Sequence, residues 1–258
     1  MLEHLTAGVS AAEAARLTRR ELPEQAPAPV DGPGDAAAVS AAVGDQLRQA
    51  LDQLDETGAQ AALDRLLAGF AQETVLREAV LPYLHDLGDR WEQTGDATIV
   101  QEHFASALLR GRLLGLARGW GGGYGPMALL ACFPGDQHDL GLICFGLALR
   151  ANGWRITFLG PDTPLVTITE TARLLSPALV VLSAMVRPDP HAVGDALAEI
   201  AARAPLAIAG DGVNASDAAK VGARFLVGDP FEAAAEIAAD PSAFAGPAGA
   251  RGPDRPGR

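Results

Sequence analysis

Residues 127–141 read MALLACFPGDQHDLG. The uninterrupted apolar run at their start indicates a strand covered on both faces, because a half-exposed strand would alternate with polar residues. A short polar loop and an apolar helical pattern follow it. Four further apolar runs, each followed by a helical pattern, begin at Trp154, Ala178, Leu206 and Ala223. The sequence therefore predicts a Rossmann-like (flavodoxin-like) five-stranded parallel sheet over residues 126–239, with helices on both faces.

Residues 38–118 carry large apolar side chains at helical spacing in four segments with short polar connections. This pattern predicts a four-helix bundle. Pro82 falls inside the third segment and is expected to kink it. The run RGWGGGYGP at residues 118–126 marks the expected boundary between bundle and sheet. The predicted fold class is thus α plus α/β.

Composition excludes several functions. The net charge of −12 and the pI near 4.8 oppose direct binding of nucleic acid by this chain. The two cysteines, Cys132 and Cys144, stand in apolar stretches and are expected to be buried, reduced thiols of a cytoplasmic protein.

We find neither an apolar run long enough to span a membrane nor a secretion signal. The proline-rich residues 22–37 and the residues 240–258 are expected to be disordered.

Ligands of open α/β sheets bind where the strands end, so the loops at those positions are candidate sites. These loops follow Phe133, Gly160, Ala184 and Gly210. The first loop contains Asp136 and His138, and two interpretations are open. Asp136 and Asp139 could favour a helix N-terminus beside a solvated His138. Alternatively, Asp136 orients the imidazole of His138 as a metal ligand.

Three spaced elements resemble a known family: Asp136-x-His138-x-x-Gly141, Ser183-x-Met185 and the turn Gly210-Asp211-Gly212. They look like the cobalamin-binding domain of methionine synthase, corrinoid methyl carriers and CarH-type photoreceptors. The resemblance implies that His138 is the lower axial ligand of cobalt. It further implies that Asp136 and Ser183 form a hydrogen-bonded relay to His138. The remaining residues implied to line the cofactor are Gly141, Met185, Gly210 and Gly212. Asp211 departs from the family's second glycine, and its carboxylate would crowd or repel the phosphate of the nucleotide tail.

The string RWEQTGDATIVQEHFAS, residues 90–106, permits an ordinary interpretation, with Trp91 in the core and Glu102 and His103 as plain polar residues. It also resembles the Trp, spacer, Glu-His signature of CarH-type light sensors, whose bundle caps the upper face of adenosylcobalamin. That resemblance implies that Trp91 packs on the adenosyl group and that Glu102 hydrogen-bonds to it. Ile99 takes the apolar position three residues before Glu102. His103 follows, either as a residue that supports a cobalt ligand or as an alternative cobalt ligand.

This signature differs from the family's in two ways. The spacer of ten residues is one longer than usual, and Glu92 replaces the His that captures cobalt after photolysis in well-known members. The upper ligand after light therefore stays open between His103, His85, water and another ligand.

Residues 2–20 resemble the end of a MerR-type DNA-binding domain without its recognition helix, although a plain helical hairpin is an equal alternative. Residues 1–37 would then comprise remnant MerR-like helices and a linker. The resemblance implies a light sensor and not an enzyme: adenosylcobalamin photolysis changes its conformation and its self-association as dimer or tetramer. It would regulate transcription directly or through a DNA-binding partner. The alternatives are a corrinoid methyl carrier for a methyltransferase system and a light-insensitive cobalamin-sensing regulator.

Overall fold

The computed structural model describes residues 33–94 and 99–240, with side chains for residues 41–90 and 99–240. Its contacts divide the chain into two units, Met1–Ala42 and Val43–Arg258. The helical residues from Val43 onward and the sheet thus belong to one unit, which is described below. The MerR-like stretch, the expected C-terminal tail and the side chain of Trp91 lie outside the described residues.

The helical half contains the segments that the apolar spacing predicts. They are α3 (Pro33–Asp52), α4 (Glu56–Gly69), α5 (Gln72–Val75), the π-helical turn η1 (Leu76–Val80), α6 (Leu81–Thr94) and α7 (Ile99–Leu116). The expected linker extends too far, because α3 already begins at Pro33. Proline is favourable in the first helical turn, and the alanines that follow it are strong helix formers.

The third predicted helix is interrupted just before Pro82. The N–H of Leu81 donates to the carbonyl of Leu76, five residues earlier, which defines the π-helical turn η1. A proline ring disturbs the α-helical hydrogen bonds of the preceding turn. The sequence predicts a kink at Pro82, and the structure places the π turn η1 shortly before this proline.

A polar cluster around the buried ring of Tyr83 joins α3 to α6 within the helical half. The hydroxyl of Tyr83 donates to Asp52 Oδ1 at 3.0 Å, and the ring of Tyr83 is buried. The guanidinium groups of Arg48 and Arg90 lie over this ring at 5.6 Å and 5.8 Å from its centroid. Burial, followed by the charge of Asp52, raises the pKa of Tyr83. The phenol therefore remains a neutral hydrogen-bond donor in the core of the bundle.

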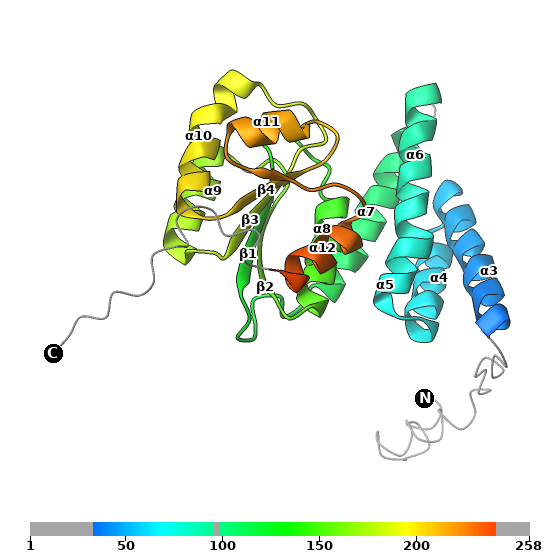
Figure 1. The fold of residues 1–258 in the computed structure, drawn as a ribbon. Coiled ribbons are helices and arrows are strands. Elements are labelled where there is room, and N and C mark those ends of the chain that lie inside the picture. Colours follow the sequence, from blue (N-terminus) through cyan, green and yellow to red (C-terminus); the bar gives the residue numbers. More distant parts are fainter. Residues whose placement is uncertain (1–32, 95–98, 241–258) are drawn as a thin grey trace, which may run out of the picture. The chain divides into compact units, whose positions relative to one another are not determined.

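The second half is an α/β domain in which five parallel strands follow the order β2-β1-β3-β4-β5 (Figure 1). Its strands are β1 (Met127–Cys132), β2 (Arg155–Gly160), β3 (Leu179–Ser183), β4 (Leu206–Ala209) and β5 (Arg224–Phe225). Its helices are α8 (Leu140–Ala151), α9 (Leu165–Leu175), α10 (Pro190–Arg203), α11 (Ala215–Lys220) and α12 (Pro230–Ala239). The predicted fold class, helices followed by a Rossmann-like five-stranded sheet, is confirmed.

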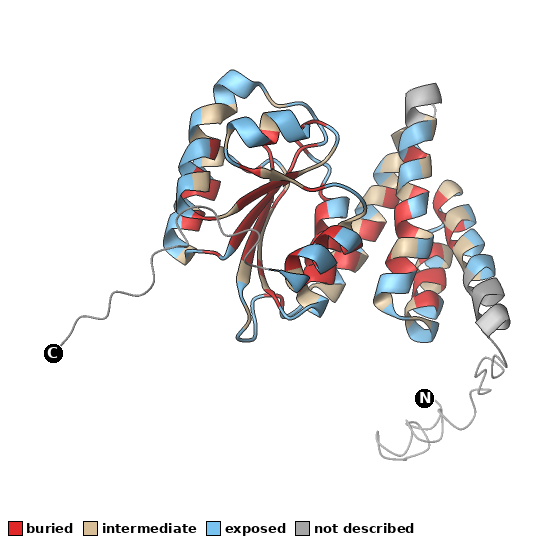
Figure 2. Cartoon of the chain, in the orientation of Figure 1, coloured by how far each residue is buried: buried red, intermediate tan, exposed pale blue. Residues whose placement is uncertain are grey.

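The sheet lies between two helical layers, α8 with α12 and α9 with α10 (Figure 1). Successive residues of β1 point alternately into these layers, as the pleat of a strand requires. Leu130 and Cys132 belong to the core under α8 and α12, whereas Leu129 and Ala131 belong to the core under α9 and α10. Figure 2 shows the central strands β1 and β3 buried, apart from the first residue of β1. Among the described helices, none combines the length and apolarity needed to cross a membrane.

The glycine-rich run between α7 and β1 is anchored by Trp120. The Trp120 ring is buried and meets Phe158 of β2 edge-on, with the ring centroids 5.7 Å apart. Its carbonyl accepts from the N–H of Ile156 at 2.9 Å. A Cβ added at Gly146 of α8 would lie 2.9 Å from the Trp120 ring. The backbone and the ring of Trp120 thus hold the run against the sheet. The ring has room beside α8 because residue 146 is a glycine.

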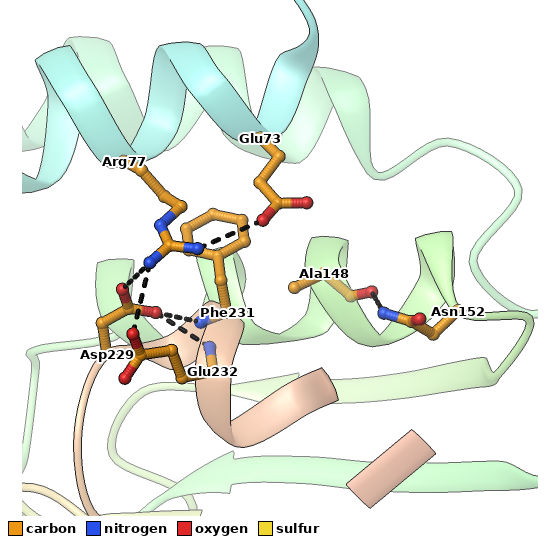
Figure 3. Close-up of polar contacts among 7 residues, drawn as sticks. All are labelled: Glu73, Arg77, Ala148, Asn152, Asp229, Phe231 and Glu232. Carbon is orange, nitrogen blue, oxygen red and sulfur yellow. Dashed lines mark hydrogen bonds and ion pairs between the residues drawn. The ribbon is translucent and has the colours of Figure 1, made fainter. Parts of the chain in front are cut away.

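Ionic contacts at Arg77 and at Arg110 join the helical half to the α/β half. In the first, Arg77 of η1 forms ion pairs with Asp229 at 2.9 Å and Glu232 at 3.4 Å (Figure 3). The same guanidinium lies 5.9 Å from the centroid of the Phe231 ring. In the second, Arg110 of α7 bonds to Asp139, at the start of α8. Only this second contact touches the loop that contains the candidate ligand His138.

Candidate functional site

The loops after β1 and β3 lie side by side, because these two strands are neighbours in the sheet. The connections from β1 and from β3 lead to helices in different layers, which makes this edge the topological switch point of the fold. The N–H of Phe133 donates to the carbonyl of Ser183 at 3.0 Å and extends the pairing beyond the strands. Ligands of doubly wound sheets bind at this kind of crevice.

Asp136 links these two loops through both oxygens of its buried carboxylate. Oδ1 accepts from the N–H of His138 at 3.0 Å, and Oδ2 accepts from the N–H groups of Met185 at 2.5 Å and Val186 at 3.1 Å. Burial alone would raise the pKa of Asp136, but these hydrogen bonds and the one from the His138 ring outweigh it and lower the pKa. The carboxylate is therefore ionised and fixed.

His138 is held by this carboxylate and yet reaches the surface. Its Nδ1 lies 2.8 Å from Asp136 Oδ1, while its side chain is 62% exposed. An ionised carboxylate can only accept a hydrogen bond, so Nδ1 carries the proton. In the neutral ring, the lone pair is then on Nε2. Of the two interpretations left open by the sequence, this geometry favours the oriented ligand. Neither Asp136 nor Asp139 caps α8 with its side chain.

The loop after β2 supports the His138 loop from the other side. The N–H of Asp162 donates to the carbonyl of Asp136 at 2.8 Å, and Asp162 Oδ1 accepts from the N–H of Gly135 at 2.6 Å. Asp162 adopts a left-handed backbone conformation, with φ of 46°, which aspartate tolerates better than most residues. Asp162 is not among the predicted site residues, although its position shortly after a predicted strand was a usable signal.

The predicted glycines Gly210 and Gly212 have a packing role in the fold. A Cβ at Gly210 would lie 2.5 Å from the Ala184 carbonyl oxygen, and one at Gly212 would lie 2.6 Å from that of Val186. These glycines therefore let the loop after β4 pack on the loop after β3, which donates to Asp136. The neighbouring side chain of Asp211 is exposed.

The remaining predicted residues of the α/β half lie at the same edge of the sheet. Ser183 ends β3 and is buried; within the described residues, its hydroxyl makes no hydrogen bond to Asp136. Gly141 lies in the first turn of α8, and a Cβ there would meet open space. Met185 is 42% exposed, as are the neighbouring Val186 at 54% and Val227 after β5 at 74%.

These features fit a large, partly apolar cofactor with a metal that lacks one axial ligand. An imidazole with a fixed orientation and a free Nε2 suits the metal. Exposed apolar side chains at the ends of β3 and β5 offer surface that a ring system could cover. The open space beside Gly141 leaves room for a group close to the helix.

The predicted residues of the helical half lie at the start of α7. Ile99 is half-buried, and Glu102 receives a hydrogen bond from the hydroxyl of Ser106 at 2.8 Å. The other oxygen of Glu102 lies 2.9 Å from Nδ1 of His103, whose side chain is exposed. Glu102 and His103 thus form an adjacent pair, while Trp91 belongs to α6.

Comparison with known proteins finds a family match in the helical half. Residues 43–114 match the family described as B12 binding domain. This stretch is therefore similar to B12 binding domains. The HTH-type transcriptional repressor CarH of Myxococcus xanthus is 34% identical over 179 residues, which are 68% of this chain and 59% of that protein. The repressor CarA of the same organism is 35% identical over 146 residues, 56% of this chain and 44% of that protein.

The resemblance to CarH-type repressors is therefore confirmed, over part of their length: the chain spans about three fifths of CarH. Both curated relatives are named as transcriptional repressors, in line with the expectation of a protein that is not an enzyme. Among solved structures, the monomethylamine corrinoid protein of Methanosarcina barkeri has the same fold. It covers 78% of this chain and 99% of its own, with a TM-score of 0.64 and 20% identity.

Proposed function

We propose that this protein binds adenosylcobalamin, with His138 as the lower axial ligand of cobalt, and acts as a light-responsive regulator of transcription. The hydrogen-bonded pair of Asp136 and His138 at the switch point is the observation that carries this proposal. The similarity of the helical half to B12 binding domains and the similarity to CarH support it.

In this proposal the loops after β1 and β3 hold the lower side of the cofactor. His138 donates its Nε2 lone pair to cobalt, and Asp136 keeps the ring oriented and basic. Gly141 and Met185 would line the edge of the cofactor. Ser183, Gly210 and Gly212 would leave room for its nucleotide tail. Asp211 next to this path opposes the tail phosphate by charge, so tail contacts are weaker than in relatives with glycine there.

The helical half holds the upper side. Trp91 shields the adenosyl group, Ile99 adds apolar contact, and Glu102 accepts from its ribose hydroxyls or adenine amine. His103, paired with Glu102, is a candidate upper ligand after the adenosyl group leaves. When bound, adenosylcobalamin supplies a cobalt–carbon bond that visible light breaks.

Loss of the adenosyl group would remove contacts that Trp91 and Glu102 would make in one state only, and this would shift the conformational equilibrium. The output is a change in self-association, as dimer or tetramer, that alters transcription directly or through a DNA-binding partner. The same lower-ligand geometry also suits a corrinoid methyl carrier, which needs an accessible upper face. It equally suits a regulator that senses cobalamin without light.

A single loading experiment separates these functions. The full chain is loaded with adenosylcobalamin in the dark, and its absorption spectrum and size-exclusion profile are recorded before and after green illumination. We expect a stable dark complex, with a spectrum and an apparent size that change on illumination. An unchanged spectrum would contradict light sensing. A preference for methylcobalamin that turns over with a methyltransferase would identify the carrier instead.

A further inference from the structure

Arg110 of α7 contacts the candidate ligand loop directly. Its Nε donates to Asp139 Oδ2 at 2.7 Å, and the side chain of Asp139 is only 2% exposed. A carboxylate buried this far is stable in its charged form only when a cation or hydrogen-bond donors satisfy it. Arg110, from the other half of the unit, supplies that charge.

Asp139 stands next to His138 in the chain and begins α8. Its carbonyl accepts from the N–H of Ile143 at 2.9 Å, and its own N–H donates to the carbonyl of Gln137 at 3.1 Å. An aspartate at this position would ordinarily cap the helix with its side chain. Here the side chain makes no capping bond and binds Arg110 instead. The loop is thus fixed on one side by Asp136 and on the other by the pair with Arg110.

Helix α7, which carries Arg110, also carries Glu102, the residue proposed to contact the upper ligand. Glu102, its hydrogen-bond partner Ser106, and Arg110 follow one another at intervals of four residues, so they form one stripe of α7. Glu102 and Arg110 are eight residues apart, which is roughly 12 Å along a helix. A rigid element therefore connects the proposed upper-face residue with the loop of the proposed lower ligand.

We infer that Arg110 is a positioning residue for His138, acting through Asp139, and that this pair couples the lower axial site to the helix that carries Glu102. The inference rests on the proposed function for its cobalamin part. The other part of the inference is that Arg110 holds the His138 loop in place. This part concerns the protein without cofactor and can be tested by itself.

Cys132 provides a reporter of this loop. Its side chain is fully buried beneath the loop, and its Sγ lies 3.8 Å from the His138 carbonyl oxygen. Cys144 in the middle of α8 is equally buried and reports on larger unfolding. If Arg110 holds the loop, its removal should increase the exposure of Cys132 more than that of Cys144.

The first test measures alkylation of both thiols in the full chain without cofactor, by mass spectrometry of the labelled peptides. We expect Arg110→Ala to label Cys132 about tenfold faster relative to Cys144, because the buried carboxylate of Asp139 loses its partly exposed ion-pair partner. A factor of ten corresponds to about 1.4 kcal/mol. Asp139→Asn removes the ion pair without leaving a buried charge, and it should also increase the rate at which Cys132 is alkylated. Arg110→Lys should restore part of the protection.

Two matched variants control for ion pairs in general. Arg77→Ala breaks the other contact between the halves, at Asp229 and Glu232 (Figure 3). Arg112 lies in α7, the same helix as Arg110, and Arg112→Ala breaks its ion pair with Asp64 of α4. Both should leave the ratio of Cys132 to Cys144 labelling as in the wild type. Equal acceleration of both thiols by Arg110→Ala, or no acceleration, would overturn the inference.

The second test uses the loaded protein. In Arg110→Ala, the absorption bands that report axial nitrogen on cobalt should weaken relative to both the wild type and Arg77→Ala. Bands of wild-type intensity would overturn the coupling. A wild-type chain that binds no cobalamin would refute the proposed function, while the labelling result would still decide whether Arg110 positions the loop.

Discussion

The ring Nδ1 and the backbone N–H of His138 both donate to one oxygen of Asp136, at 2.8 Å and 3.0 Å. The second oxygen of Asp136 serves the loop after β3, where Met185 and Val186 donate their N–H groups. One buried carboxylate thus fixes the imidazole relative to both strands that border the switch point. This arrangement explains how an exposed histidine keeps one orientation.

Asp136→Asn should therefore damage both the fold and the site. Its amide cannot accept from all four donors, and an N–H₂ group would face another N–H group. We expect the free energy of unfolding to fall by about 2–3 kcal/mol and the cobalamin affinity to fall about 10- to 100-fold. Urea denaturation and cofactor titration measure the two effects.

Asp189→Asn is the matched control. Asp189 caps α10 by accepting from the N–H of His191, and asparagine caps helices equally well. This variant should behave as the wild type in both measurements. Wild-type stability in Asp136→Asn would show that its carboxylate does not organise the loops.

Gly141→Ala should separate stability from binding. The added methyl group meets open space in the first turn of α8, and alanine favours a helix over glycine by roughly 0.5–1 kcal/mol. We expect a slightly more stable protein that binds cobalamin more weakly, because the methyl group occupies room proposed for the cofactor. Gly194→Ala, equally open on α10, should stabilise without changing affinity. Equal affinities of the two variants would place the cofactor away from Gly141.

Gly212→Ala tests the packing of the loop after β4. Its Cβ would lie 2.6 Å from the Val186 carbonyl oxygen, which belongs to backbone and cannot rotate away. We expect a loss of about 1–3 kcal/mol in the free energy of unfolding, as for other overpacked positions. Thermal unfolding without cofactor measures it. A variant as stable as the wild type would mean that the loop yields to the methyl group at little cost.

The fold was largely predictable because parallel strands buried on both faces read as continuous apolar runs. The five runs starting at Met127 correspond to the five strands, although β5 is reduced to Arg224 and Phe225. The helical spacing located the four segments of the helical half. It could not show that Pro82 would be accommodated by a π turn, because that depends on hydrogen bonding along the backbone.

The site was only partly predictable. Asp136 and His138 stand two residues apart, so their pairing could be proposed from sequence. The contact between Arg110 and Asp139 spans 29 residues of sequence and joins two side chains that each read as an ordinary surface charge. The close approach of Gly210 and Gly212 to the loop after β3 was likewise invisible, because a glycine in sequence does not reveal which backbone it faces.

The two thiols should be inert in the folded protein. Burial raises the pKa of Cys144 to about 12, and burial together with the charges of Asp136 and Asp139 raises the pKa of Cys132 to about 12. At pH 8, roughly one thiol in ten thousand is then a thiolate. We expect no fast reaction with Ellman's reagent before denaturation and two reactive thiols after it. A rapid reaction of the native protein at pH 8 would contradict this burial.

The central claim, that His138 binds cobalt, is tested most directly by electron paramagnetic resonance. The chain is produced with ¹⁵N-labelled histidine, loaded with cob(II)alamin and compared with unlabelled protein. If His138 is the axial ligand, each cobalt line should split into a doublet in labelled protein and a triplet in unlabelled protein, and His138→Ala should abolish the dependence on the label. A triplet in both samples would show that the cofactor's own base remains on cobalt, and would contradict the account.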